Sequence, residues 1–186
     1  MKIQGNAIER ARKIKLVIFD VDGVLTDGGV YVGEHGELYK PFYCRDGLAI
    51  ALLRRVGIKT AVITGRTSKM VTSRAAELKI DAVWQGHLDK REAYAELKQQ
   101  FGITDDEAAY IGDDLVDLPV MLQAGLAAAV GDAVPEVKKI SHVIADARGG
   151  CGAVRELLEF ILKAQGLWEG IVDGFMHPES LTGLAQ

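Results

Sequence analysis

Two carboxylates stand where an early apolar run stops. The run Leu16–Phe19 ends in Asp20, and Asp22 follows two residues later with Gly23 behind it. Because side chains alternate along an extended chain, Asp20 and Asp22 can face the same side, where their repulsion favours a bound cation or a protonated partner. A catalytic pair and a plain turn are both open on these residues. A calcium loop is excluded, because the further oxygen ligands and the distal Glu of the EF-hand pattern are absent.

A second acidic group follows the apolar run Ala108–Ile111. It comprises Asp113, Asp114 and Asp117. At ordinary effective dielectric constants, carboxylates repel one another by about 1–4 kcal/mol per close pair, so we expect a cation beside them. The donors are hard oxygens with no His or Cys cluster nearby, which favours Mg²⁺ over zinc.

Two further positions are candidates for holding an anion. Thr64 and Gly65 follow the predicted strand Ile58–Ile63 and precede a predicted helix, so a hydroxyl, backbone amides and a helix dipole coincide there. Lys90 falls in the first turn of a helix that we expect to begin at Asp89, where a cation is unfavourable unless an anion is close. A common Thr-Gly turn and a solvated lysine are the alternatives at these positions.

The elements that must position these residues alternate along the chain. Short apolar runs predict strands, and amphipathic segments between them predict helices. This alternation predicts an α/β fold with a doubly wound parallel sheet, in which the C-terminal strand ends meet at one edge and bring the candidate residues together. The predicted strands are Leu16–Phe19, Ile58–Ile63, Asp81–Trp84, Ala108–Ile111, Ala127–Val130 and His142–Ile144.

A small insertion and a tail depart from this alternation. Residues 28–43 predict a β-hairpin with a turn at Glu34-His35-Gly36, placed directly after the first acidic pair. An isolated hairpin is marginally stable in water, so we expect this one to pack on another subunit. The tail, about residues 166–186, is rich in glycine but keeps large apolar residues, which indicates docking on a surface.

A helix cap and a glycine turn are predicted from local patterns. Asp46 is expected to be the N-cap of a helix whose apolar stripe includes Leu48. The glycines at positions 149 and 150 predict a flexible turn that lets Arg148 or Arg155 approach the site. A nucleotide-binding loop of the Walker type is rejected, because no Gly-Lys-Ser/Thr ending follows these glycines.

Composition bounds the class of protein. The 186 residues are 48% hydrophobic, which suffices for one α/β domain spanning 1–186. A net charge of -4 and the lack of a basic run argue against nucleic acid or an anionic membrane as the main partner. Two cysteines, no signal peptide and no run of transmembrane length predict a cytoplasmic protein.

The order of motifs resembles the haloacid dehalogenase superfamily of phosphatases over nearly the whole chain. The motifs are DVDGVLT from Asp20, ITGR ending at Arg66, Lys90, and GDDLVD from Gly112. The stretches YCRDGLAI and RGGCGAVRELLEFILKAQG further resemble the 3-deoxy-D-manno-octulosonate 8-phosphate phosphatases, which lack a cap domain and act in lipopolysaccharide precursor synthesis. The resemblance implies a homotetramer in which the hairpins form a central barrel and a neighbouring subunit completes each active site. At Cys151, a basic residue would match the family pattern.

The resemblance also implies catalytic and metal-binding roles. Asp20 would be the nucleophile that attacks phosphorus, and Asp22 would protonate the leaving group and later activate water. Mg²⁺ would be held by the Asp20 side chain, the Asp22 main-chain carbonyl and Asp113, with Asp114 and Asp117 in support. The implied reaction is Mg²⁺-dependent hydrolysis of 3-deoxy-D-manno-octulosonate 8-phosphate through an aspartyl phosphate.

The same resemblance implies which residues contact the phosphate and the substrate. Thr64, Gly65 and Lys90 would hold the phosphoryl oxygens. A guanidinium binds a carboxylate in a two-point fork, so arginines near the site are candidates to pair with the sugar acid, with a surface position as the alternative for each. These arginines are Arg45, Arg66 and Arg74.

Three other functions are alternatives to this phosphatase activity. Phosphatases of nine-carbon 2-keto sugar acids share the core motifs. A phospho-acceptor switch of the receiver type also combines clustered Asp, Thr, Lys and Mg²⁺, but the Asp two residues after Asp20 is what a hydrolase needs to finish turnover. A sugar-phosphate mutase is disfavoured because no large cap domain is present to exclude water.

Overall fold

The fold is built on one strand that is buried on both faces. The computed structural model describes residues 1–177. Strand β2 (Leu16–Phe19) lies inside a seven-stranded sheet of order β1-β9-β8-β7-β2-β5-β6, in which every neighbouring pair is parallel except β1 and β9. The other strands are β1 (Lys2–Ile3), β5 (Lys59–Thr64), β6 (Ala82–Gln85), β7 (Ala108–Gly112), β8 (Leu126–Ala129) and β9 (Val143–Ile144). The predicted doubly wound parallel sheet is confirmed.

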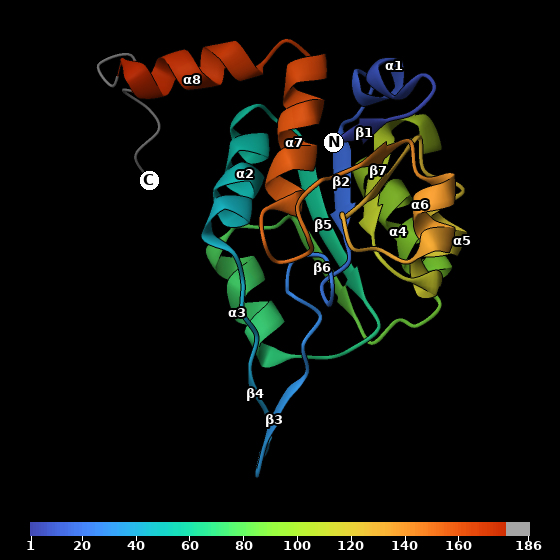
Figure 1. Cartoon of the computed structure of the whole chain (residues 1–186), viewed down its shortest axis with the longest axis vertical. Helices are drawn as coiled ribbons and strands as arrows, with labels where there is room; N and C mark the ends of the chain where they lie inside the picture. Colours follow the sequence, from blue (N-terminus) through green and yellow to red (C-terminus); the bar gives the residue numbers. More distant parts are fainter. Residues whose placement is uncertain (178–186) are drawn as a thin grey trace.

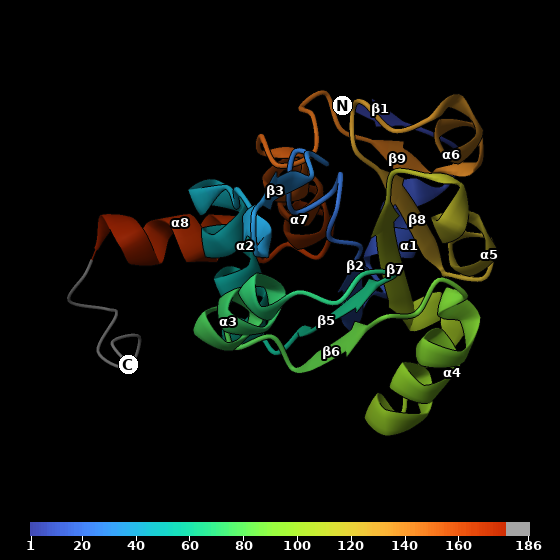
Figure 2. The same ribbon diagram turned by 90° about the horizontal axis from the view of Figure 1, so that it is seen from below.

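Helices cover both faces of this sheet (Figures 1 and 2). Helices α2, α3 and α7 lie on one face, and α4, α5 and α6 lie on the other. Burial on both faces explains why the strands are continuous apolar runs. The helices are α1 (Ala7–Ala11), α2 (Cys44–Arg55), α3 (Lys69–Glu77), α4 (Lys90–Phe101), α5 (Leu118–Met121), α6 (Pro135–Ile140), α7 (Ala153–Ala164) and α8 (Trp168–Met176). Short 3-10 turns cover Asp105–Glu107 and Leu115–Asp117.

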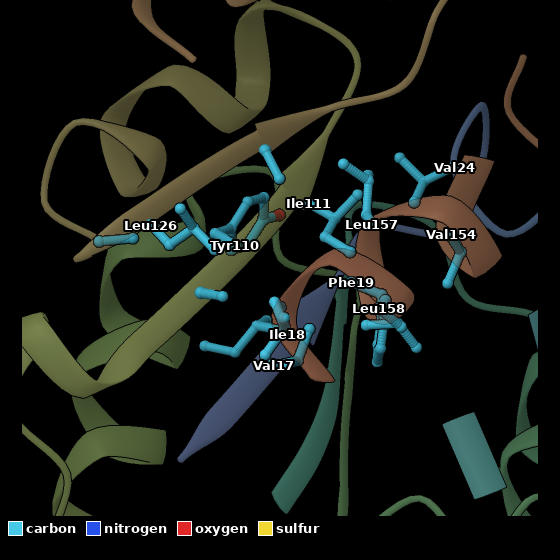
Figure 3. Close-up of a cluster of buried hydrophobic side chains, with 14 of the residues drawn as sticks. Val17, Ile18, Phe19, Val24, Tyr110, Ile111, Leu126, Val154, Leu157 and Leu158 are labelled. Carbon is cyan, nitrogen blue, oxygen red and sulfur yellow. The ribbon is translucent and has the colours of Figure 1, made fainter. Parts of the chain in front are cut away.

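The hydrophobic core packs α7 onto the central strands (Figure 3). Leu157 and Leu158 of α7 lie beside Phe19 of β2, and all three side chains are fully buried. Burying one such side chain stabilises the fold by about 1.5–3 kcal/mol. The core therefore fixes the strand that carries the first acidic pair.

The order of the strands places the two acidic groups side by side. From β2 the chain moves to β5 and β6, and then returns to the other side of β2 with β7. Phe19 of β2 pairs in register with Ile111 of β7, and the Asp20 N–H donates to the Ile111 carbonyl at 3.0 Å. Ligands in such sheets collect beyond the strand ends at this point of reversal.

The predicted hairpin is present and projects from the body of the chain (Figure 1). It consists of β3 (Tyr31–Gly33) and β4 (Gly36–Tyr39), both within the predicted range 28–43. The rings of Tyr31 and Tyr39 stack 4.3 Å apart. Val32 and Leu38 are 70% and 62% exposed, so the hairpin presents apolar side chains to its surroundings.

The prediction that Asp46 caps its own helix is wrong. Helix α2 begins one turn earlier, with Tyr43 at the N-cap, and Leu48 is exposed rather than part of the buried stripe. The buried Asp46 carboxylate instead accepts a hydrogen bond of 2.7 Å from the backbone N–H of Arg155 in the first turn of α7. Asp46 thus caps a helix that is distant in sequence, which local patterning does not reveal.

The glycine turn before α7 packs tightly against the loop after β2. A Cβ on Gly149 would lie 1.7 Å from the carbonyl oxygen of Gly23, in the loop after β2. Arg148 and Arg155 form ion pairs with carboxylates outside the acidic groups. The glycines of this turn are therefore needed for close backbone approach. The approach of Arg148 or Arg155 to a bound substrate stays a prediction.

The two ends of the chain add elements that patterning did not locate. Strand β1 pairs antiparallel with β9 at the sheet edge, and Lys2 lies opposite Ile144 in this pair. Part of the predicted tail is helix α8, and residues 178–186 of that tail lie outside the described residues. Within residues 1–177, none of the helices has the length and apolar character needed to cross a membrane.

We predict that Gly149→Ala destabilises the protein and slows turnover. The added methyl group would force the Gly149 and Gly23 backbones apart, and overpacking of this kind costs about 1–3 kcal/mol. Gly170→Ala is the matched control, because a Cβ at Gly170 meets no atom within 4 Å. Thermal unfolding and initial rates measure the effect. Equal behaviour of the two variants would contradict the tight contact.

Candidate active site

A buried lysine lies between the two acidic groups. Lys90 is the first residue of α4, whose N-cap is Asp89 as predicted, and it is only 1% exposed. Its Nζ lies 2.8 Å from Asp20 Oδ1 and 2.6 Å from Asp117 Oδ1. Burial alone lowers the pKa of Lys90, but the two carboxylates outweigh burial and raise that pKa. The anion expected near Lys90 is thus supplied by the protein itself.

Asp117 is the structural centre of the second acidic group. Its Oδ1 accepts from Lys90 and, at 2.8 Å, from the hydroxyl of Tyr110. Its Oδ2 accepts from the backbone N–H groups of Asp113 at 2.9 Å and Asp114 at 3.2 Å. Both oxygens of Asp117 are therefore satisfied by protein donors, and Asp117 orders the loop that carries Asp113.

The ionised forms of Asp20 and Asp113 are disfavoured by their surroundings. Burial, followed by repulsion from Asp117, raises the pKa of Asp20 to about 6, although Lys90 opposes the rise. Burial, followed by repulsion from Asp20 and the other acidic residues, raises the pKa of Asp113 to about 8. The buried Asp113 Oδ1 has no hydrogen-bond partner. A cation beside these two carboxylates would relieve both effects.

The acidic cluster fits a small divalent cation. One oxygen from each of Asp20, Asp113 and Asp117 lies within 4.8 Å of the others. Since Asp117 is satisfied by protein donors, Asp20 and Asp113 are the side chains with oxygens open to an ion. A Cβ on Gly23 would lie 2.1 Å from Asp113 Oδ2, so only glycine lets the loop after β2 come this close. Hard, closely spaced oxygens suit Mg²⁺.

Asp22 is held apart from this cluster by a lysine that sequence patterning missed. Lys40, just after β4, contacts Asp22 Oδ1 with its Nζ and lies 3.2 Å from Glu37 Oε1. The Lys40 side chain is 2% exposed, which is unusual for lysine. A single lysine after an edge strand carries no local signal of burial, because the contact depends on how the hairpin folds back.

Two of the three predicted phosphate-binding residues, Thr64 and Gly65, lie at the end of β5. Thr64 is buried, and its Oγ1 accepts weakly from the Arg66 N–H at 3.5 Å. A Cβ at Gly65 would lie 2.9 Å from the terminal methyl group of Leu88, an exposed side chain that can move aside, so packing alone does not require glycine there. Ser68 caps α3 by accepting from the Met70 N–H. The predicted strand, turn and helix start are confirmed.

The three candidate arginines lie in different surroundings. The Arg66 Nε lies 3.7 Å from Asp22 Oδ2, so Arg66 reaches the site. Arg74 pairs with Glu77 at 2.8 Å and stands over the Phe42 ring. Arg45 is exposed in the first turn of α2. Among the three, Arg66 is the one for which the described part of the chain shows a contact to Asp22.

Comparison with known proteins identifies the family. Residues 80–157 match the family model of the haloacid dehalogenase-like hydrolases. A 3-deoxy-D-manno-octulosonate 8-phosphate phosphatase of Yersinia pestis is 45% identical over 168 residues, covering 90% of this chain and 90% of that protein. The chain belongs to this phosphatase family. The sequence-based resemblance is thereby confirmed.

Solved structures of this phosphatase family share the fold over most of their length. The phosphatase from Yersinia pestis gives a TM-score of 0.86 at 46% identity, over 88% of this chain and 89% of that one. The phosphatase from Moraxella catarrhalis, solved with a magnesium ion, a phosphate ion and KDO, gives 0.88 at 41% identity, over 91% and 97%. A family member therefore holds metal, phosphate and sugar acid together on this fold.

We predict that the metal-free phosphatase loses stability as the pH rises. The raised pKa values of Asp20 and Asp113 mean that the folded chain binds more protons than the unfolded chain, whose Asp pKa is near 3.8. The stabilising effect of these protons is complete below pH about 3.8 and is lost as the pH rises through about 6 and about 8. Mg²⁺ competes with those protons, so its stabilising effect should grow over the same range.

Thermal unfolding with a chelator, and then with Mg²⁺, measures this effect. Asp113→Asn should remove most of the pH dependence and most of the response to Mg²⁺. Asp106→Asn is the control, because Asp106 is exposed and pairs only with the exposed Lys13 among the described residues. A midpoint that stays flat with pH in the metal-free wild type would contradict the electrostatic account.

Proposed function

We propose that the chain is a Mg²⁺-dependent phosphatase that hydrolyses 3-deoxy-D-manno-octulosonate 8-phosphate to KDO and phosphate through an aspartyl phosphate. The observation that carries this proposal is that two neighbouring carboxylates are held by two different lysines. Asp20 is buried against Lys90, and Asp22 is held separately by Lys40. This arrangement supports attack by one carboxylate and proton transfer by the other.

The first half-reaction transfers the phosphoryl group to the enzyme. Asp20 attacks phosphorus and forms an Asp20–phosphorus bond while the ester oxygen–phosphorus bond breaks. Asp22 gives its proton to the departing sugar oxygen. The salt bridge from Lys90 at 2.8 Å fixes the Asp20 carboxylate, which reduces the reorganisation needed before attack.

The second half-reaction regenerates the enzyme. Asp22, now ionised, takes a proton from water as the water attacks phosphorus, and the Asp20–phosphorus bond breaks to release phosphate. An acid for one step and a base for the next is the property that separates a phosphatase from a stable phospho-acceptor. The position of Asp22 therefore favours hydrolysis over the receiver-type switch.

Charge on the transferring group is balanced by the surrounding residues. The Asp20 side chain, the Asp22 carbonyl and Asp113 would hold Mg²⁺, with Asp114 and Asp117 in support. When bound, the ion neutralises phosphoryl oxygens and acts as a Lewis acid. Such electrostatic stabilisation is usually the largest contribution to catalysis.

The phosphoryl oxygens would be held by residues at two strand ends. Thr64 and Gly65 offer a hydroxyl and a backbone N–H at the end of β5. Lys90 would shift part of its interaction from Asp20 to the transferred phosphoryl group.

The sugar acid is assigned from the family and from the charge at the rim of the site. The Moraxella catarrhalis relative binds KDO. Arg66 beside Asp22 is our first candidate to pair with the substrate carboxylate, and Arg45 and Arg74 are further candidates. A nine-carbon 2-keto sugar acid phosphate is the alternative substrate, because it carries the same carboxylate and phosphate.

We also propose that the working form is a cytoplasmic homotetramer. The hairpin exposes Val32 and Leu38, and such an apolar surface supports burial between subunits. Arg74 lies in a groove with Tyr39 and Lys40 at the base of the hairpin, where it could serve a site shared with a neighbour. The exposed free thiols of Cys44 and Cys151 support a reducing compartment.

We predict that the eight-carbon substrate is preferred. Phosphate release, with Mg²⁺, should be faster from 3-deoxy-D-manno-octulosonate 8-phosphate than from a nine-carbon 2-keto sugar acid phosphate at matched concentrations. Asp20→Asn is the control for contaminating phosphatases and should abolish release from both. Preference for the nine-carbon compound would overturn the substrate while leaving the chemistry in place, and release by Asp20→Asn at the normal rate would overturn the chemistry.

A further inference from the structure

Lys40 is buried beside Asp22, although the steps proposed above give it no part in the reaction. Its side chain is 2% exposed, and its ammonium group contacts Asp22 Oδ1 and lies 3.2 Å from Glu37 Oε1. Burying an ammonium group is costly unless carboxylates pair with it. A lysine that served only to keep the hairpin in solution would extend into water.

The contact with Lys40 leaves the two oxygens of Asp22 in different surroundings. Oδ1 is taken by Lys40, whereas Oδ2 faces the Arg66 Nε at 3.7 Å, which exceeds hydrogen-bond distance. One oxygen is therefore fixed and the other is open. This is the arrangement that a carboxylate needs if it is to exchange a proton with a ligand at a defined position.

Lys40 is itself held from the body of the fold. Glu37, its second partner, accepts a hydrogen bond from the hydroxyl of Ser68, the N-cap of α3. Arg66 Nη2 lies 4.0 Å from Glu37 Oε1. The hairpin is thus tied to α3 through Glu37 and to the loop after β2 through Lys40, so the position of Lys40 does not depend on the exposed hairpin tip.

We propose that Lys40 is a positioning residue that fixes Asp22 for proton transfer to the leaving group and from water. This inference rests on the proposed role of Asp22. Lys40 acts through Asp22 and exchanges no proton with the substrate. Its loss should therefore harm the reaction in the same pattern as loss of Asp22, but to a smaller extent.

The leaving group provides a readout that a merely structural role would not move. When the ester bond breaks, an alkoxide or phenolate must take a proton from Asp22, whereas a nitrophenolate is stable without one. Because kcat/KM reports only the steps up to phosphoryl transfer, it is insensitive to the later attack by water. Defective proton donation should thus lower kcat/KM for phenyl phosphate and for the sugar phosphate, and spare p-nitrophenyl phosphate.

The test compares Lys40→Met with a matched control, Lys59→Met. Lys59 also forms a lysine–aspartate pair, at 2.8 Å with Asp81, but it lies at the N-terminal end of β5, the opposite edge of the sheet from the site. For Lys40→Met we expect kcat/KM to fall about 10- to 100-fold with phenyl phosphate and the sugar phosphate, and less than about 3-fold with p-nitrophenyl phosphate. Lys59→Met should match wild type with all three esters.

Each other outcome has a defined meaning. An equal fall with both aryl phosphates, or a loss confined to the sugar phosphate through a higher KM, would overturn the proposal in favour of a structural or substrate-binding role. Lys40→Arg, which keeps the charge, should recover part of the loss with phenyl phosphate. If Lys40→Met does not fold, the same ratio of phenyl to nitrophenyl rates in Lys40→Gln, which removes the charge but stays polar, decides: a ratio equal to that of wild type contradicts the proposal.

Asp22→Asn separates failure of this inference from failure of the proposed function. It should show the same selective loss at about 10²- to 10⁴-fold. If Asp22→Asn loses activity equally with both aryl phosphates, the assignment of Asp22 is wrong. If Asp22→Asn is selective and Lys40→Met is not, Asp22 keeps its role and only the proposal for Lys40 is overturned.

Discussion

The site depends on the buried ammonium group of Lys90. It stands between Asp20 and Asp117, with all three side chains nearly removed from solvent. Each buried ion costs several kcal/mol in lost hydration, and removing one partner leaves an uncompensated charge. The carboxylates that repel one another can therefore share one sheet edge only because a cation from α4 lies among them. The N-cap at Asp89 fixes where that cation enters.

Backbone contacts connect this ion cluster to the two loops that carry the carboxylates. Asp117 accepts from the N–H groups of Asp113 and Asp114, which shapes the loop after β7. On the other side, the close approach of Gly149 to Gly23 fixes the loop after β2. The two loops carry the carboxylates that remain open to a metal ion, so contacts within the protein itself define where those carboxylates lie. This is preorganisation, and it is why few residues suffice for a difficult hydrolysis.

Sequence reasoning located the parts of this site that follow from strand ends. Asp20, Thr64 and Asp113 each come at or just after the last residues of a buried apolar run, and parallel pairing must bring such positions together. It did not find the contacts that depend on packing between distant segments. Asp46 caps α7 rather than its own helix, and Lys40 reaches Asp22 across the hairpin. Neither residue differs in type from an ordinary surface residue, so only the folded chain distinguishes them.

Asp20 is the residue proposed to carry the phosphoryl group, and trapping that group on Asp20 is the most direct test. Asp22→Asn should slow hydrolysis of the intermediate but spare its formation from p-nitrophenyl phosphate, whose leaving group needs no proton. Acid quenching during turnover of that ester, followed by peptide mass spectrometry, should therefore find one phosphoryl group on Asp20. The double variant with Asp20→Asn should carry none. A phosphoryl group on Asp113, as in a receiver-type switch, or an unmodified chain at every quench time would contradict the account.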